Sequence, residues 1–112
     1  MQATLDAVAN PRRREILRLI WSAELSAGEI ASHFDVTWPA VSQNLRVLRS
    51  AGLVTERRAG NRRLYRANRR ALRPLEPVLR RMWTDDLARL KSLAERESTK
   101  GRSRWKSRAR SR

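Results

Sequence analysis

Cysteine is absent from the 112 residues of the chain, and histidine occurs once, as His33. Without a thiol the chain can form no disulfide, no thiolate metal site and no cysteine nucleophile. One histidine with neither cysteines nor suitably spaced carboxylates beside it makes neither a metal site nor a catalytic base. We therefore expect no metal and no cofactor, and we interpret His33 as a structural residue.

Long apolar segments are also missing. The N-terminal MQATLDAVANPRRR has none of the apolar core of a signal peptide, and EILRLIW is short and interrupted by charge. These features predict a cytoplasmic protein without a membrane partner. A chain of 112 residues is long enough for one compact domain and too short for two ordinary ones, so a single hydrophobic core is expected.

Acidic residues are few compared with basic ones. The 26 lysines and arginines against 11 aspartates and glutamates give a formal net charge of +15. Clustered positive charge attracts polyanions, so nucleic acid is the first candidate partner and an acidic membrane surface the second. Composition alone does not separate these two partners.

Two consecutive short helices are predicted in the middle of the chain. In LSAGEIASHFDV, Ser26 and Glu29 have the spacing of a capping box. In TWPAVSQNLRVL, residues 37–48, Thr37 can cap the first turn, and Pro39 suits the opening because its missing N–H has no partner there. The short connection DVT between the two completes a helix-turn-helix pattern.

The second of these helices has an apolar face and a polar face. Val41, Leu45 and Leu48 recur at the i, i+4, i+7 spacing of a buried stripe. Gln43 and Arg46 point the other way. Glutamine pairs with adenine and arginine with guanine through two hydrogen bonds in the major groove, so the polar face is predicted to contact DNA.

The helix-turn-helix is flanked by a helix pair and by a hairpin. LDAVANPRRREILRLIWSAE predicts a short helix, a break at Asn10 and Pro11, and a second helix. After SAGLV, where Gly52 can end the preceding helix, LVTERRAGNRRLYRAN predicts two strands. They flank Gly60 and Asn61, which favour the positive φ of a hairpin turn, and we name this basic hairpin the wing.

The C-terminal third predicts a long helix and a tail. Apolar residues recur near 3.6-residue spacing from about Ala71 to Glu97, although Pro77 leaves open where this helix begins. We expect residues 1–97 to form the folded domain. Residues 98–112 carry seven lysines and arginines and no acid, which predicts a disordered basic tail. The tail either adds phosphate contacts or serves as dispensable solubilising sequence.

Taken in order, these pieces resemble a winged-helix repressor of the bacterial arsenical-resistance regulator family, the ArsR/SmtB family. PRRREILRLI is similar to the family's P.R..IL..L opening, AVSQNLRVLRSAGLV to its S.HL..L..AGLV helix, and RRAGNRRLYR to its wing. The resemblance covers roughly residues 5–95, and the combination is more specific than any single piece. One difference is Asn44, where the family usually has histidine.

The resemblance implies a mainly α (α+β) fold, a winged helix-turn-helix with a two-stranded wing and terminal dimerisation helices. It also implies a homodimer that binds an inverted-repeat operator in double-stranded DNA, blocks transcription and releases DNA when an effector binds. Metal-sensing members carry a signature like ELCVCDLA, where this chain has ELSAGEIA with Ser26 and Gly28 at the cysteine positions. The C-terminal helix has Asp85 and Asp86 but no histidine, so we expect no metal sensing, and the effector is unknown.

Within this fold, the residues predicted to contact DNA lie on the second helix of the helix-turn-helix and on the wing. They are Thr37, Trp38, Pro39, Ala40, Ser42, Gln43, Asn44, Arg46, Arg57, Arg58, Asn61, Arg62 and Arg63. Four arginines at one hairpin tip would repel one another unless a polyanion relieves the repulsion. Trp38 is expected to pack at the domain edge rather than to intercalate.

A small domain already has its core in the middle helices, so much of the C-terminal apolar stripe would stay uncovered in a monomer. We therefore predict a dimer interface from both ends of the chain. Its residues are Leu5, Val8, Leu79, Met82, Trp83, Leu87 and Leu90.

The sequence thus predicts a homodimeric transcriptional regulator of the bacterial nucleoid that acts as a repressor. The alternatives are a winged-helix protein that binds DNA or RNA without sequence preference, and a winged helix used for protein contact. An enzyme is the weakest option, because Asp85 and Asp86 lie on different helix faces and no nucleophile with a base is apparent.

Overall fold

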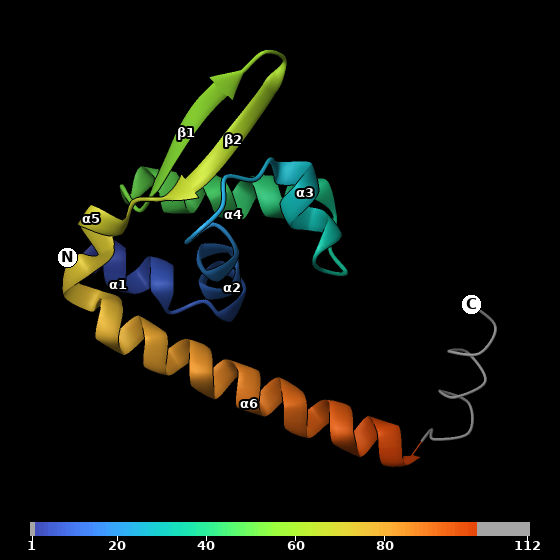
Figure 1. Cartoon of the computed structure of the whole chain (residues 1–112). Helices are drawn as coiled ribbons and strands as arrows, with labels where there is room; N and C mark the ends of the chain where they lie inside the picture. Colours follow the sequence, from blue (N-terminus) through green and yellow to red (C-terminus); the bar gives the residue numbers. More distant parts are fainter. Residues whose placement is uncertain (1, 101–112) are drawn as a thin grey trace. The chain divides into compact units, whose positions relative to one another are not determined.

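The computed structural model describes residues 2–100, and of residues 97–100 the backbone alone (Figure 1). The elements are α1 (Gln2–Val8), α2 (Pro11–Leu19), α3 (Ala27–Ser32), α4 (Trp38–Ser50), β1 (Val54–Ala59), β2 (Arg62–Ala67), α5 (Arg69–Leu72), the 3-10 helix η1 (Arg73–Leu75) and α6 (Glu76–Lys100). The chain divides into one unit that ends at Arg80 and a second that begins at Arg81. The first unit contains the predicted helix-turn-helix and the wing.

Side-chain caps fix the beginnings of several helices. The Asn10 side chain accepts hydrogen bonds from the backbone N–H groups of Arg12 and Arg13 at the start of α2. Ser26 and Glu29 form both bonds of the predicted capping box on α3. The Thr37 hydroxyl accepts the N–H of Ala40, at 3.3 Å. Each cap satisfies N–H groups that have no partner inside the helix, so α4 begins at a defined residue.

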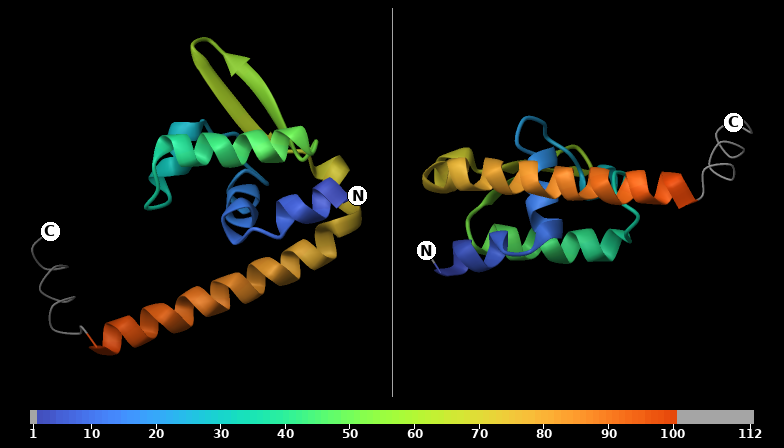
Figure 2. Two further views of the ribbon diagram at one scale, coloured as in Figure 1. Left: turned by 180° about the vertical axis from the view of Figure 1, so that it is seen from behind. Right: turned by 90° about the horizontal axis from the view of Figure 1, so that it is seen from below.

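The first unit is built around α4. Val41, Leu45 and Leu48 are buried, as their spacing predicted. The helices α1 and α2 lie on one side of α4 and the wing on the other (Figure 1 and Figure 2). Apolar side chains from α2, α3, α4 and the following segments complete this core: Ile16, Leu17, Ile20, Ile30, Leu53 and Leu72. The opposite face of α4 is thereby left to solvent.

Two arginines of the PRRR motif attach α1 to α2. Arg13 donates to the carbonyl oxygens of Asp6 and Ala7 (3.2 and 2.8 Å), and Arg14 donates to those of Val8 and Ala9 (2.9 and 3.1 Å). The last carbonyls of a helix lack partners within it, and their partial negative charge favours a guanidinium group. The predicted break at Asn10 and Pro11 is therefore a tight corner held by two buried or half-buried arginines.

The wing is an antiparallel hairpin whose register runs from Val54 opposite Ala67 to Ala59 opposite Arg62. The predicted turn is present, but only Gly60 has a positive φ, of 64°, while Asn61 does not. A two-residue connection with positive φ at its first residue matches a type II′ turn, which suits the twist of the strands. Gly52, after α4, also has the predicted positive φ, of 77°.

A single antiparallel bridge joins β2 to the segment before α3. The N–H of Leu25 donates to the carbonyl of Tyr65 at 3.1 Å, and the N–H of Tyr65 donates back at 2.8 Å. The base of the wing is therefore hydrogen-bonded to the helix-turn-helix through the main chain.

The predicted helix over residues 71–97 is interrupted. Pro74 lies in η1, and α6 begins at Glu76, which places Pro77 in the first turn of α6, where proline has no N–H to lose. The helix is assigned as far as Lys100, past the predicted end of the folded domain at residue 97, and the rest of the predicted tail lies outside the described residues. None of the helices in the described range is long and apolar enough to cross a membrane.

Candidate nucleic-acid interface

The outward face of α4 presents Gln43 and Arg46 to solvent. Both side chains are exposed, together with Pro39 and Ala40, on the side of the helix opposite its buried residues. The side chains of Gln43 and Arg46 form no hydrogen bond or ion pair with any other residue that the structure describes. These two polar groups are therefore available to a ligand that approaches α4.

Asn44 lies at one flank of this face and is engaged by the protein. Its side-chain oxygen accepts a hydrogen bond from Arg13, at 3.4 Å, and the residue is half-buried. Arg13 at the same time holds the end of α1. The structure therefore gives Asn44 a supporting position between α2 and α4, away from the outward face where Gln43 and Arg46 lie.

Trp38 begins α4 and lies over α3. A Cβ atom added to Gly28 would be 3.4 Å from the nearest carbon of the indole ring, so the ring rests against this glycine. The indole packs at the edge of the domain as expected, yet 61% of the residue is exposed. Ser26 and Gly28 stand where metal-sensing members have cysteines, and here they have structural roles. Ser26 caps α3, and Gly28 leaves room for the Trp38 ring.

Carboxylates pair with three of the four predicted wing arginines. Arg57 binds Glu24 at 2.9 and 2.8 Å, Arg62 binds Glu29, and Nε of Arg63 is 3.4 Å from Glu56. Much of the expected repulsion is therefore neutralised within the protein, and the expectation that only a polyanion relieves it is wrong. The sequence did not indicate these pairs, because Glu24 and Glu29 are each 33 residues from the arginine that they bind.

Arg58 differs from the other three wing arginines that were predicted to contact DNA. In the register of the hairpin it lies directly opposite Arg63, where like charges repel. Among the side chains that the structure describes, it has no carboxylate partner. Of the four wing arginines predicted to contact DNA, Arg58 is therefore the one most available to an external anion.

The paired glutamates are held in their charged form. Arg57, through its hydrogen bonds, is the main cause of the lowered pKa of Glu24, and Glu24 raises the pKa of Arg57 in return. The pKa of Glu29 is lowered first by the backbone N–H of Ser26, then by the Ser26 side chain, with a smaller effect of Arg62. Both ion pairs are thus fully formed at neutral pH.

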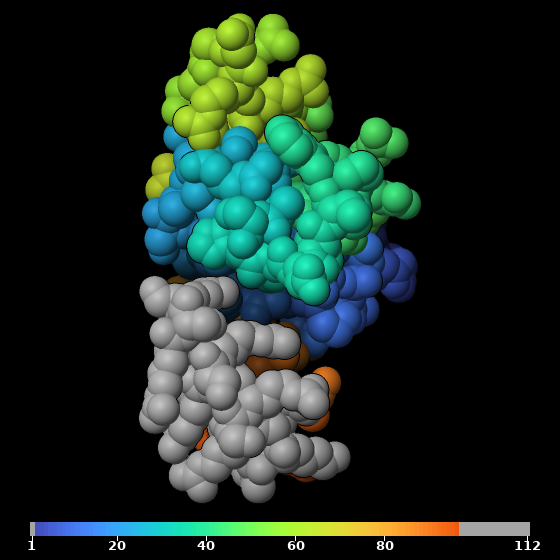
Figure 3. Space-filling view, turned by 90° about the vertical axis from the view of Figure 1, so that its right-hand side faces the viewer, coloured from blue at the N-terminus to red at the C-terminus, as the bar shows by residue number. Residues whose placement is uncertain are grey.

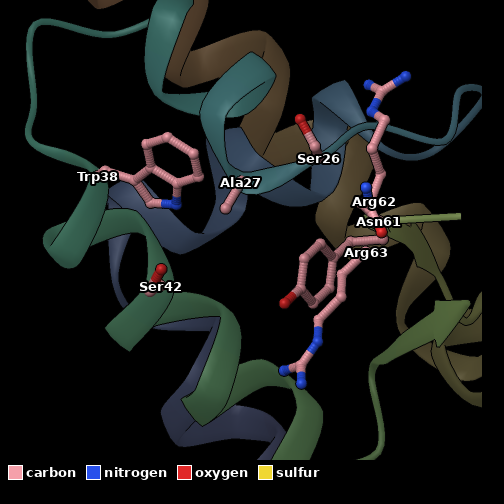
Figure 4. Close-up of a pocket in the computed structure, with 8 residues that line it drawn as sticks. Ser26, Ala27, Trp38, Ser42, Asn61, Arg62 and Arg63 are labelled. Carbon is pink, nitrogen blue, oxygen red and sulfur yellow. The ribbon is translucent and has the colours of Figure 1, made fainter. Parts of the chain in front are cut away.

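A hollow of about 450 Å³ lies between α3, the start of α4 and the wing, which form one continuous surface in Figure 3. Figure 4 shows Trp38 and Ser42 on α4, Ser26 just before α3 and Ala27 in its first turn, and Asn61, Arg62 and Arg63 on the wing; Tyr65 also lines the hollow. The sequence reasoning missed Tyr65 as a site residue. The predicted turn at Gly60 and Asn61 could have indicated it. Residues two apart on a strand share a face, so Tyr65 lies on the same face of β2 as the predicted Arg63.

The predicted interface residues divide into two groups. Val8, Leu79 and Trp83 are buried within a single chain, Leu79 to 1% exposure, so this part of the predicted interface is already covered in the monomer. Met82 is half-buried. Leu5, Leu87 and Leu90 are exposed, Leu87 to 46%. Of the predicted interface residues, the exposed ones are those left for contact with a partner.

Comparisons with known proteins agree with this architecture. The family model of the bacterial regulatory protein, arsR family, matches residues 10–56. The HTH-type transcriptional regulator Rv2034 of Mycobacterium tuberculosis is 40% identical over 92 residues, which cover 82% of this chain and 86% of that protein. The transcriptional repressor SdpR of Bacillus subtilis is 34% identical over 68 residues, covering 61% and 76%.

A solved structure shares the fold. It is the homodimeric winged helix-turn-helix DNA-binding domain of a possible ArsR-family transcriptional regulator from Mycobacterium bovis, determined in solution by NMR. It is 31% identical, with a TM-score of 0.66, and the match covers 75% of this chain and 78% of that one. The resemblance in the sequence is confirmed: this chain belongs to the arsR family of bacterial regulatory proteins and is a winged helix-turn-helix transcriptional regulator.

Proposed function

We propose that the protein represses transcription by binding an inverted-repeat operator in double-stranded DNA as a homodimer. The α4 helix of each chain enters a major groove, the two grooves being about one helical turn, roughly 34 Å, apart. The main support for the proposal is the outward polar face of α4, where the side chains of Gln43 and Arg46 have no partner among the described residues. Thr37 caps the helix that presents them. The bacterial nucleoid is then the place of action.

The predicted DNA-contacting residues take different roles in this proposal. Gln43 and Arg46 read base edges, and Ala40 allows the helix to approach them closely. Thr37, at the positive end of α4, donates to a phosphate. Arg58 makes the main contact between the wing and the DNA backbone beside the half-site. Asn44 does not contact DNA itself and instead accepts a hydrogen bond from Arg13, which supports α4.

The dimer is proposed from the exposed apolar residues at both ends of the chain. Leu5 on α1 and Leu87 and Leu90 on α6 are large side chains left in contact with water. A second copy of the chain would remove them from water, which is favourable at about 25 cal/mol per Å². The homodimeric assembly of the M. bovis relative supports this arrangement.

Selection from random duplex DNA at near-physiological salt tests the function. We expect the full-length protein to enrich an imperfect palindrome, with two half-sites one helical turn apart. Binding without any enriched sequence would contradict the proposal and support the alternative of a protein that binds nucleic acid through charge alone.

A further inference from the structure

The hollow between α3, α4 and the wing is lined by several hydrogen-bond donors that have no partner in the described part of the chain. Three of them are the indole N–H of Trp38 and the hydroxyl groups of Ser42 and Tyr65. None of the three forms a hydrogen bond with a residue in the described part of the chain. Water satisfies such donors in the free protein, and a ligand oxygen can replace that water at little cost.

The charge of the hollow favours an anion. Arg62 and Arg63 line it, and no carboxylate does. Each guanidinium group has five N–H donors, and the bonds to Glu29 and Glu56 use only part of them. Three neutral donors and two cations around one space suit an oxygen-rich anion such as a phosphate.

The size and the walls of the hollow indicate more than a free phosphate ion. Its volume of about 450 Å³ falls within the range of sites that hold whole small molecules. Trp38 and Tyr65 contribute aromatic walls beside the donors. A phosphate attached to a sugar fits this combination, because the apolar edge of deoxyribose can contact the indole while the oxygens meet the donors.

The donors are also held in place before any ligand binds. Ser42 belongs to the second turn of the capped helix α4, and the main chain of Tyr65 is bonded to Leu25 in both directions. A single anion that bound both hydroxyls would join α4 to β2. Since phosphate contacts set how a protein is positioned on the duplex, such a contact would fix the depth of α4 in the groove.

We propose that the hollow seats one backbone phosphodiester of the bound DNA in each half-site. Tyr65, Ser42 and Arg63 hold the phosphate oxygens, and the deoxyribose lies against Trp38. This inference rests on the proposed function and deepens it, because it names the contact that aligns the helix with the wing. Tyr65 is thereby assigned as a DNA-contacting residue.

A double-mutant cycle between the protein and the DNA tests this seat. The protein carries Tyr65→Phe or Ser42→Ala, and the selected operator carries one methylphosphonate per half-site, moved along the strand. Tyr65→Phe is expected to bind the unmodified operator roughly a hundredfold more weakly, about tenfold for each of the two half-sites, the effect of losing a hydrogen bond to a charged group. At one methylphosphonate position, and only there, the substitution should cause no further loss.

Controls separate the seat from folding and from the function itself. Ser22→Ala, an exposed serine in the loop after α2, should bind every duplex like the wild type. Thermal unfolding should be unchanged in Tyr65→Phe and Ser42→Ala. If the affinity losses from the substitution and from the methylphosphonate are additive at every position, while the wild type binds the operator normally, the proposed phosphate site is wrong and the proposed function stands. Failure of the wild type to bind any selected operator overturns both.

A free anion is distinguished from the DNA backbone by exchanging chloride for inorganic phosphate at constant ionic strength. We expect the operator affinities of the wild type and of Tyr65→Phe to change by the same factor. If inorganic phosphate weakens operator binding by the wild type but not by Tyr65→Phe, the hollow binds free phosphate, and the proposal is wrong.

Discussion

Arg57 on β1 binds the carboxylate of Glu24 with two N–H groups, at 2.9 and 2.8 Å. Glu24 precedes Leu25, the residue whose main chain is bonded to β2. A second pair, between Arg62 and Glu29 on α3, attaches the other strand of the wing. Exposed ion pairs contribute little to stability, so we interpret these two as contacts that orient the wing on the helix-turn-helix.

Glu24→Gln tests the pairing of Arg57 with Glu24. The substitution removes a negative charge and frees Arg57, so binding to random-sequence duplex should strengthen, and its dependence on salt should become steeper by about one phosphate contact per chain. Measurement of affinity against salt concentration checks this expectation. Glu76→Gln is the matched control, because Glu76 pairs with Arg80 on α6 and lies outside the wing. The same steepening in both variants would mean that only net charge matters.

The wing contacts should persist until the solution is strongly acidic. The folded-state pKa values of Glu24 and Glu29 are lowered, so their contribution to stability is complete above the ordinary glutamate value, about 4.3, and is lost as the pH falls below it. NMR signals of the Leu25 and Tyr65 amides should stay constant from pH 8 to about 5 and change only below the ordinary glutamate value. A transition near pH 6 would contradict the assignment to the glutamates.

Arg14→Met should destabilise the folded protein. The guanidinium group is buried and donates to the carbonyls of Val8 and Ala9, which would lose these partners. The free energy of unfolding should fall by about 2 kcal/mol, as expected when buried polar groups become unpaired. Urea unfolding at fixed protein concentration measures the change. Arg12→Met, which removes an exposed arginine placed over the Phe34 ring, should have a clearly smaller effect.

Leu87→Glu should convert the dimer into monomers with weak operator binding. Leu87 is about half exposed within one chain, so a charge there disturbs an interface rather than the chain's own core. Sedimentation velocity gives the oligomeric state, and operator binding follows in the same samples. Ala88→Glu adds the same charge to the next helical position and should keep the dimer. An intact Leu87→Glu dimer would place the interface elsewhere.

Local signals in the sequence predicted most of the elements correctly. The capping box of Ser26 and Glu29, the cap at Thr37 and the positive φ of Gly60 each depend on residues within a few positions of one another. Apolar periodicity identified the buried face of α4 for the same reason. The start of α6 was the exception, because Pro74 and Pro77 allowed more than one beginning.

Contacts between distant residues could not be predicted in the same way. Nothing in the sequence around Arg57 indicates that Glu24 is its partner, because the pairing depends on how the wing lies against the segment before α3. Leu79 and Leu87 belong to one apolar pattern, yet the structure buries the first and exposes the second. Periodicity gives the face of a helix, whereas the folded chain decides which part of that face is covered.

The central claim, that α4 reads the sequence of DNA, is tested most directly by comparing the operators that the wild type and Arg46→Ala select from random duplex DNA. We predict that Arg46→Ala loses the preference for one base pair in each half-site and keeps the rest of the palindrome. Specific binding should weaken more than binding to random DNA. Selection of an unchanged operator with uniformly weaker binding would contradict the claim and show that Arg46 touches only the backbone.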